Sequence, residues 1–196
     1  MDLGVLGGIQ LADWIILIYF LAFFVLGFAQ GTIRRLIGIA SILFSFLFAA
    51  NVAGPLGDFL KTNWTDQNPQ YSFMVGFLTI FVAAALAFAI VVQGFYRPQP
   101  LFEKARFVDE IIGGFLGLLQ AGIILGAMVV ILDSYYRLAG LQPRPAELGF
   151  LRDLWSFLDQ SQIVAIFRET IIPAFFNLVG LFIPSNIRVM FPGGAS

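Results

Sequence analysis

The sequence contains neither cysteine nor histidine. The absence of cysteine excludes disulfides and thiol chemistry, and the absence of histidine removes the usual general base and the commonest metal ligand. A serine–histidine catalytic dyad is therefore impossible. The motifs HExxH, GxxxxGK[ST] and GxGxxG are also absent. We therefore expect no enzyme activity, no catalytic residues, no cofactor and no metal site.

Charge is also scarce. Charged residues make up 12 % of the 196 residues, whereas hydrophobic residues make up 59 %. A typical soluble domain has roughly 25 % charged residues. So few charges could hardly cover the surface of a soluble fold, so composition predicts a membrane protein whose main partner is the lipid bilayer. The formal net charge of −1 gives no reason to expect nucleic acid as a partner.

Four long uncharged runs account for most of the hydrophobic residues. They cover residues 14–29, 36–56, 71–92 and 111–132. About 20 apolar residues are enough to cross the hydrocarbon core of a bilayer as a helix. The sequence therefore predicts an all-α membrane protein, a bundle of four transmembrane helices, with the four spans contained in residues 1–133.

The remaining residues, 134–196, have a different character. Charged residues and prolines are mixed with apolar ones as far as residue 160, where we expect a short helix near residues 150–158. The chain then becomes apolar again but contains Arg168, Glu169 and a proline, and its uncharged part has only about 15 residues, which is short for a span. We predict an amphipathic C-terminal helix in an interfacial region. A fifth, short span is the alternative.

The distribution of Lys and Arg predicts the orientation of the helices. The connections after the first and third runs carry five such residues, whereas the connection after the second carries only Lys61. Short cytoplasmic loops are enriched in Lys and Arg. We therefore place the first and third connections in the cytoplasm and the N-terminus outside. Arg137, Arg144 and Arg152 weaken this orientation, because four spans would place them outside as well.

Small residues recur every fourth position in several predicted helices. In the fourth run, one register holds Gly113, Gly117 and Ala121, and a second holds Gly114, Gly122 and Gly126; the first helix ends with Gly27 and Gly31. This spacing creates a flat strip along a helix, where another helix can approach closely. We expect these residues to serve helix packing within a compact bundle or an oligomer.

Three charged residues mark the ends of the predicted helices: Asp13, Arg34 and Asp109. The predicted topology places Arg34 and Asp109 on the same membrane face, so an ion pair between them is one hypothesis. The other is that Asp109 simply caps its own helix, where the helix dipole favours a carboxylate. Asp13 lies at the opposite face, where the capping interpretation also applies. Gln120, near the middle of its run, is expected to bond a neighbouring helix or to line a permeation path.

Together, two of these segments resemble the colicin V production protein (CvpA) family. The family's first helix begins near an Asp and ends in a turn similar to the one after Gln30, and Asp13 precedes Gly31 by 18 residues. The family's fourth helix opens with an Asp that is followed by a glycine at every fourth residue. Asp109, Gly113 and Gly117 match this pattern. Ser161 matches a later family serine that precedes an amphipathic stretch.

The sequence departs from the family pattern at four positions. Gln30, Arg35, Glu110 and Ala121 stand where the family usually has Arg, Glu, Arg and Gly. The resemblance implies a multi-pass protein of the bacterial inner membrane that is linked to production or export of a peptide toxin. It implies no catalytic residues.

We therefore expect a non-enzymatic membrane factor that supports bacteriocin (toxin) production of the colicin V type or envelope homeostasis. The alternative is a small oligomeric channel or transporter in which Gln120 and the glycine faces line a path. Besides the bilayer, the expected partners are further copies of the chain or other membrane proteins.

Overall fold

The computed structural model describes residues 10–64, 68–95, 106–137 and 147–179. Every regular element in these ranges is a helix. The long helices are α1 (Leu11–Gln30), α2 (Thr32–Asn63), α3 (Pro69–Phe95) and α4 (Arg106–Tyr136). All four are long and apolar enough to cross a membrane. The prediction of four membrane-spanning helices is confirmed.

Shorter helices follow the four spans. They are α5 (Gly149–Asp159), α6 (Gln162–Ile166), the π-helical segment η2 (Phe167–Ile171) and α7 (Ile172–Val179). The short helix expected near residues 150–158 is therefore present as α5. The segment that begins at α6 is amphipathic as predicted, because Val164 and Phe167 are buried whereas Gln162 and Glu169 are exposed. A fifth membrane span is not found among the described residues. The interfacial location of this segment stays a prediction.

The long helices extend beyond the uncharged runs, and the extension is longest at the end of α2. The uncharged run ends at residue 56, but α2 continues past Asp58 and Lys61 to Asn63. The continuation packs closely on α3, because a Cβ atom added to Gly57 would lie 3.2 Å from the Cα atom of Phe73. Tertiary packing therefore accompanies a helix that extends beyond its apolar stretch, and placing Lys61 in the connection after the second run is wrong, because it lies in the last turn of α2.

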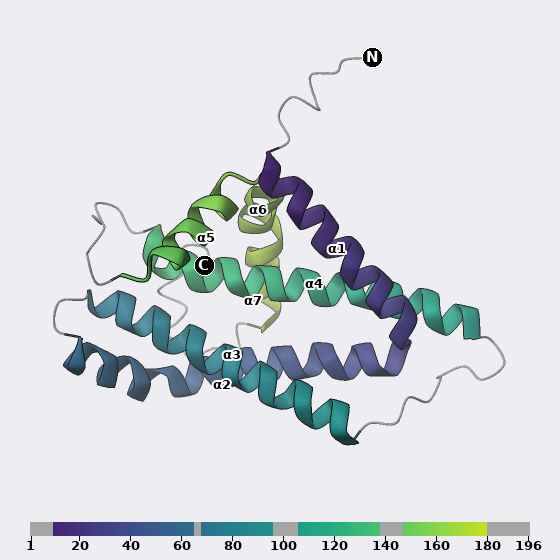
Figure 1. The fold of residues 1–196 in the computed structure, drawn as a ribbon, viewed down its shortest axis with the longest axis horizontal. Coiled ribbons are helices and arrows are strands. Elements are labelled where there is room, and N and C mark those ends of the chain that lie inside the picture. The colour runs from purple at the N-terminus through teal and green to yellow at the C-terminus, as the bar shows by residue number, and fades with distance from the viewer. Residues whose placement is uncertain (1–9, 65–67, 96–105, 138–146, 180–196) are drawn as a thin grey trace, which may run out of the picture.

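The four long helices are arranged as three roughly aligned helices and one oblique helix. Figure 1 shows α2, α3 and α4 along the long axis of the molecule, with α1 crossing α4 at an angle. The closest neighbours are α2 with α3 and α1 with α4. The helices α5 and α6 gather near the start of α1, and α7 extends from there across α4 (Figure 1).

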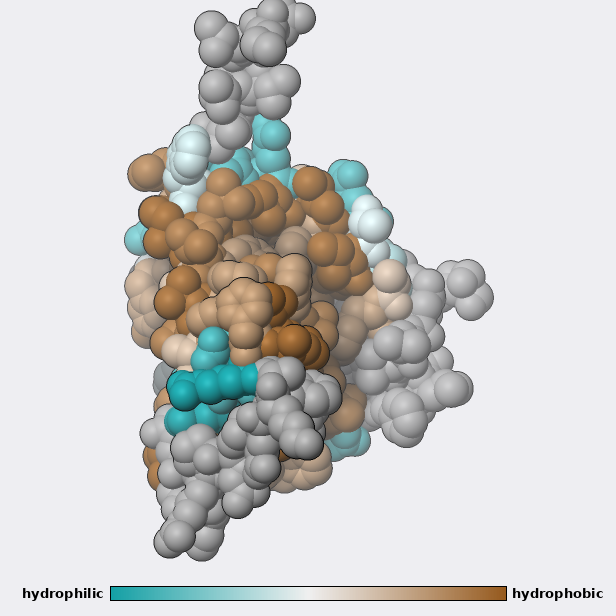
Figure 2. All heavy atoms as spheres, turned by 90° about the vertical axis from the view of Figure 1, so that its right-hand side faces the viewer, coloured by the Kyte–Doolittle hydropathy of each residue, from teal (hydrophilic) through white to brown (hydrophobic). Residues whose placement is uncertain are grey.

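The hydrophobic core is densest where α3 begins and α4 ends. Tyr71, Met74, Leu132 and Tyr135 are completely buried there. The outward sides of the long helices instead expose large apolar side chains, as helices that contact lipid acyl chains require. Figure 2 shows one end of the molecule, where hydrophobic side chains cover most of the described surface and hydrophilic ones lie in a group low in the view and along the upper rim.

Candidate functional site

The contact between α1 and α4 is built from glycine backbone. A Cβ atom added to Gly113 would lie 2.5 Å from the carbonyl oxygen of Gly27, and one added to Gly117 would fall on the carbonyl oxygen of Phe23. Farther along this contact, the Tyr19 hydroxyl donates to the carbonyl oxygen of Ala121 at 3.1 Å. The structure thus places Gly27, Gly113, Gly117 and Ala121 together, and no side chain larger than hydrogen fits at the three glycines.

Gly31 separates α1 from α2 by a single residue. Its φ of 75° and ψ of 175° lie in a region that essentially only glycine adopts. A Cβ atom here would also lie 2.5 Å from a carboxylate oxygen of Asp109. The tight turn therefore depends on glycine for two reasons, its backbone conformation and the nearby carboxylate.

Asp109 lies against the start of α2, where the first backbone N–H groups of a helix lack partners. The Thr32 N–H donates to Asp109 Oδ1 at 3.4 Å, and the Thr32 hydroxyl donates to the Asp109 carbonyl oxygen at 3.1 Å. No ion pair joins Asp109 to Arg34 in the described part of the chain. Asp109 thus caps the neighbouring helix α2, an arrangement that neither sequence-based hypothesis included.

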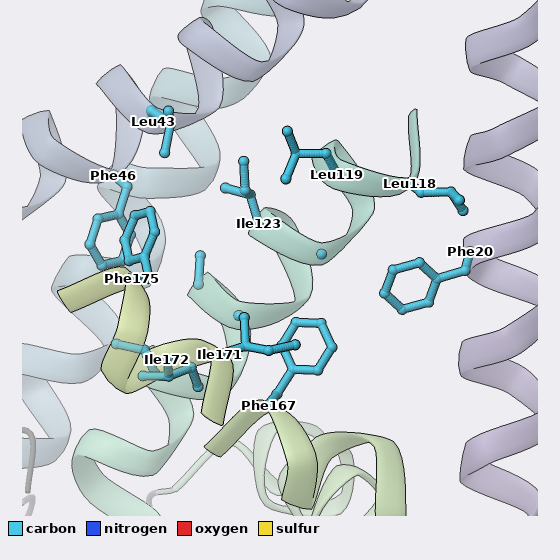
Figure 3. Close-up of a pocket in the computed structure, with 14 residues that line it drawn as sticks. Phe20, Leu43, Phe46, Leu118, Leu119, Ile123, Phe167, Ile171, Ile172 and Phe175 are labelled. Atoms are coloured by element: carbon cyan, nitrogen blue, oxygen red, sulfur yellow. The ribbon is translucent and has the colours of Figure 1, made fainter. Parts of the chain in front are cut away.

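The second glycine register of α4 divides between two neighbours: Gly114 packs on the Phe24 ring of α1, where an added Cβ atom would lie 2.8 Å from the ring, whereas the other two glycines face the C-terminal helices. Gly122 and Gly126 lie opposite the ring of Phe167, which a Cβ atom at either glycine would meet at ordinary contact distance. They line an apolar cavity of about 430 Å³ between α1, α2, α4 and the segment from η2 to α7. Figure 3 shows Phe20 approaching this cavity from α1 and Phe175 from the opposite side.

Asp13 connects α1 to the C-terminal helices through a buried hydrogen-bond network. Its Oδ1 accepts from the Ser161 hydroxyl at 2.6 Å and from the Ile163 N–H at 3.1 Å. Its Oδ2 accepts from the Gln10 N–H at 3.0 Å, which caps α1 as predicted. Ser161 in turn accepts from the Val164 N–H and so caps α6. The side chains of Asp13 and Ser161 are both nearly fully buried. The Asp13 carboxylate therefore accepts hydrogen bonds from protein groups in place of water.

A second polar group, which we call the C-terminal polar cluster, consists of Asp133, Trp155, Asp159 and Arg168. Arg168 donates from Nε and Nη2 to the two carboxylate oxygens of Asp133, both at 2.7 Å, and from Nη1 to Asp159. The Trp155 indole donates to Asp133 at 2.9 Å. Burial lowers the pKa of Arg168, but its hydrogen bonds to Asp133 and Asp159 and their negative charge raise the pKa above its usual value overall. Arg168 therefore stays protonated.

Glu147 forms a third polar contact beside this cluster. It accepts from the Tyr135 hydroxyl at 2.6 Å and from Arg152, whose guanidinium also lies 5.1 Å from the centre of the Tyr136 ring. The Tyr71 hydroxyl accepts from the Leu148 N–H at 2.7 Å. These bonds fix the start of α5 on the beginning of α3 and the end of α4.

Arg35 and Gln120 form a separate polar contact on the other side of the bundle. Arg35 Nη1 donates to Gln120 Oε1 at 2.7 Å, and the guanidinium lies 5.7 Å from the centre of the Phe23 ring. Arg35 is only 5 % exposed. Both residues line a cavity of about 360 Å³ between α2, α3 and α4, which we call the Arg35 cavity. Arg34 lines the same cavity.

The buried carboxylates of the C-terminal contacts are already occupied by hydrogen-bond donors. The buried Asp13 carboxylate accepts hydrogen bonds from the Ser161 hydroxyl and from backbone N–H groups, and Asp133 accepts from an arginine and an indole. In the described ranges, no three acidic side chains come together as a group that could hold a metal ion. The expectation of no cofactor and no metal stays a prediction.

Sequence reasoning singled out Asp13, Ser161 and Gln120 separately but did not pair any of them. The Asp13–Ser161 contact joins residues 148 positions apart, and the Arg35–Gln120 contact joins residues 85 positions apart. The only available signal was that Asp13 and Ser161 both match family positions. The C-terminal polar cluster was missed, because Arg168 was interpreted as an interruption of an apolar stretch.

Comparison with known proteins gives one family. The family model described as Colicin V production protein matches residues 12–171. The match includes the four spans, the Asp13–Ser161 contact and the C-terminal polar cluster. No curated protein and no solved structure matches the chain.

Proposed function

Because the chain belongs to the colicin V production protein family, we propose that it is a non-catalytic factor of the bacterial inner membrane. In this proposal it supports production or export of a bacteriocin of the colicin V type, or the integrity of the cell envelope during that process. The observation that carries the proposal is the family match, which extends from α1 through η2. The chain is a multi-pass membrane protein.

The buried polar contacts support a role in assembly. Asp13 and Ser161 tie α6 to the beginning of α1, and the C-terminal polar cluster ties η2 to the end of α4. These bonds join segments that are far apart in the sequence. Together, α6, η2, the beginning of α1 and the end of α4 form one platform at a single end of the spans. A platform of this kind offers a partner protein a defined surface, and its polar groups stabilise that surface instead of taking part in a reaction.

A complementation experiment tests the proposal. A producer strain that lacks its own family member and carries the colicin V genes would receive the wild-type chain, the Ser161→Ala variant or the matched Ser156→Ala variant. The Ser156 hydroxyl bonds only within its own helix, so this variant controls for loss of a hydroxyl. We expect the wild type and Ser156→Ala to restore the zone of growth inhibition on a sensitive lawn, and Ser161→Ala to restore it less.

Membrane levels of each variant would be compared by immunoblot. If the wild-type chain were present in the membrane and neither restored toxin secretion nor reduced detergent sensitivity of the deletion strain, the proposal would be wrong.

An oligomeric channel or transporter is the second candidate function, and one observation favours it: Gln120 lines the Arg35 cavity within the membrane-spanning region. The glycine faces support it less, because α1 and the C-terminal helices already cover them. Purified protein in liposomes would distinguish the two functions. Solute leakage above that of empty liposomes, reduced by Gln120→Leu, would favour the channel, whereas tight liposomes would exclude it.

A further inference from the structure

The Arg35 cavity combines a basic end with an apolar wall. Gln30, Arg34 and Arg35 lie where α1 ends and α2 begins, next to the turn at Gly31. Farther along the helices, the lining is apolar and includes Phe81 and Met128. A ligand that fits both parts needs a polar head at the membrane boundary and a hydrocarbon chain that extends into the bilayer.

Among the residues that the structure describes, none neutralises the charge at the basic end. No ion pair to Arg34 or Arg35 exists in the described ranges, and Arg35 Nε is buried without a hydrogen-bond partner there. A buried guanidinium that lacks a counter-charge is unfavourable, because it has lost its water and the neutral Gln120 amide replaces only part of it. The nearest acidic residues of α4 are engaged elsewhere, Asp109 with Thr32 and Glu110 with Arg106.

The apolar wall is reachable from the lipid. Val82 and Leu86 line the cavity and are also 41 % and 60 % exposed on the outside of α3. Small residues, including Gly38 and Ala85, keep the space between the helices open. At about 360 Å³ the cavity lies within the size range of small-molecule sites, roughly 300 to 1,000 Å³.

We propose that the Arg35 cavity binds an anionic phospholipid from the surrounding membrane. The phosphodiester accepts hydrogen bonds from Arg35 and Arg34, since the planar guanidinium matches the geometry of phosphate oxygens. One acyl chain lies along the wall formed by α3 and α4. Gln120 holds Arg35 in position through its 2.7 Å hydrogen bond, so Gln120 is a positioning residue.

The test uses the full chain, purified in mild detergent and depleted of lipid. Phosphatidylglycerol and phosphatidylcholine with the same acyl chains would be added separately, and bound lipid would be measured by native mass spectrometry alongside thermal unfolding. Inorganic phosphate at the same concentration forms a third arm, which separates a lipid from a free anion. We expect phosphatidylglycerol to bind about tenfold more tightly than phosphatidylcholine, a difference of about 1.4 kcal/mol, and phosphate to have no effect.

Variants of both parts of the cavity complete the test. Arg35→Gln should weaken phosphatidylglycerol binding about tenfold, whereas Arg35→Lys should retain most of it. Ala85→Phe should weaken binding by filling the apolar wall while leaving both arginines in place. Arg106→Gln is the matched control, because the Arg106 side chain is 84 % exposed and does not line the cavity.

Equal binding of the two lipids, stabilisation by phosphate alone, or the same loss in Arg106→Gln as in Arg35→Gln would overturn the proposal. If Arg35→Gln fails to fold, Ala85→Phe and Arg35→Lys decide the outcome, and unchanged binding in Ala85→Phe would reject the lipid. Lipid binding is measured without toxin production, so a negative result leaves the proposed function unaffected.

Discussion

The contact between α1 and α4 uses bare glycine backbone, whereas the contacts that hold α6 and η2 to the spans use paired polar side chains. In the first, Gly27 lies against Gly113 and Gly117 so closely that an added methyl group would meet main-chain atoms. In the second, Asp13 meets Ser161 and Asp133 meets Arg168. Both contacts join parts of the chain that are distant in sequence.

The difference reflects where each contact lies. Between two helices surrounded by lipid there is no hydrophobic driving force, so association depends on close packing and dispersion. The C-terminal helices carry charged and polar residues. Contacts between these residues are favourable when every buried charge has a partner. The α1–α4 contact should therefore be sensitive to the volume of a substitution, and the C-terminal contacts to its charge and hydrogen bonds.

The largest expected effect comes from adding volume to the glycine contact. Gly117→Ala places a methyl group on the Phe23 carbonyl oxygen, so α1 and α4 must separate, and the free energy of unfolding should fall by about 3 kcal/mol. Gly54→Ala is the control, because nothing lies within 4 Å of its added Cβ atom. Thermal unfolding in detergent measures both. Equal stability of the two variants would contradict the view that side-chain volume limits the contact between α1 and α4.

Removing charge from the C-terminal polar cluster should have the next largest effect. Arg168→Gln removes the guanidinium that bonds both oxygens of the largely buried Asp133 and leaves it only Arg137, at 4.0 Å, which we expect to cost about 2 to 3 kcal/mol. Arg106→Gln removes an arginine from an exposed pair and should change stability by about 0.5 kcal/mol or less. Limited proteolysis after Arg residues, together with Trp155 fluorescence, would report release of η2. Equal protection in both variants would refute the distinction.

The Asp13–Ser161 contact should give a smaller effect. Ser161→Ala removes one buried hydrogen bond and the cap of α6, which together cost about 1 to 2 kcal/mol. A double-mutant cycle with Asp13→Asn should give a coupling of about 1 kcal/mol in chemical denaturation. Additive effects of the two substitutions would mean that the side chains do not interact.

The smallest expected effect is the coupling energy between Asp109 and Arg34, where the sequence suggested an ion pair. Exchanging the charges, by Asp109→Arg together with Arg34→Asp, should not repair the damage of Asp109→Arg, because Asp109 caps α2 through Thr32. We expect a coupling of less than about 0.5 kcal/mol between positions 34 and 109. A double variant more stable than Asp109→Arg alone by over about 1 kcal/mol would restore the ion-pair hypothesis.

The architecture could be predicted because it depends on the order and length of apolar and charged segments along the sequence. The length of uncharged runs located the four spans, and the mixture of charged and apolar residues located α5. The contacts could not be predicted in the same way. Nothing near Asp13 in the sequence indicates Ser161, and nothing near Gln120 indicates Arg35, since each contact depends on how helices cross.

The π-helical segment was also beyond the reach of sequence patterns. Arg168 and Glu169 interrupt an apolar stretch, which favoured an amphipathic helix in an interfacial region. In the structure the wider turn from Phe167 to Ile171 brings Arg168 onto Asp133, 35 positions earlier, while Phe167 stays buried. A regular period of 3.6 residues does not describe such a turn.

The cap that Asp109 provides for α2 can form only late in the synthesis of the chain. Thr32 leaves the ribosome 77 residues before Asp109, which corresponds to roughly 4 to 15 s of synthesis at 5 to 20 residues per second. During that interval the hairpin of α1 and α2, with its turn at Gly31, exists without the carboxylate that completes it. The α1–α2 hairpin is therefore synthesised before its packing partner, and α4 later supplies both the cap for α2 and the glycine surface for α1.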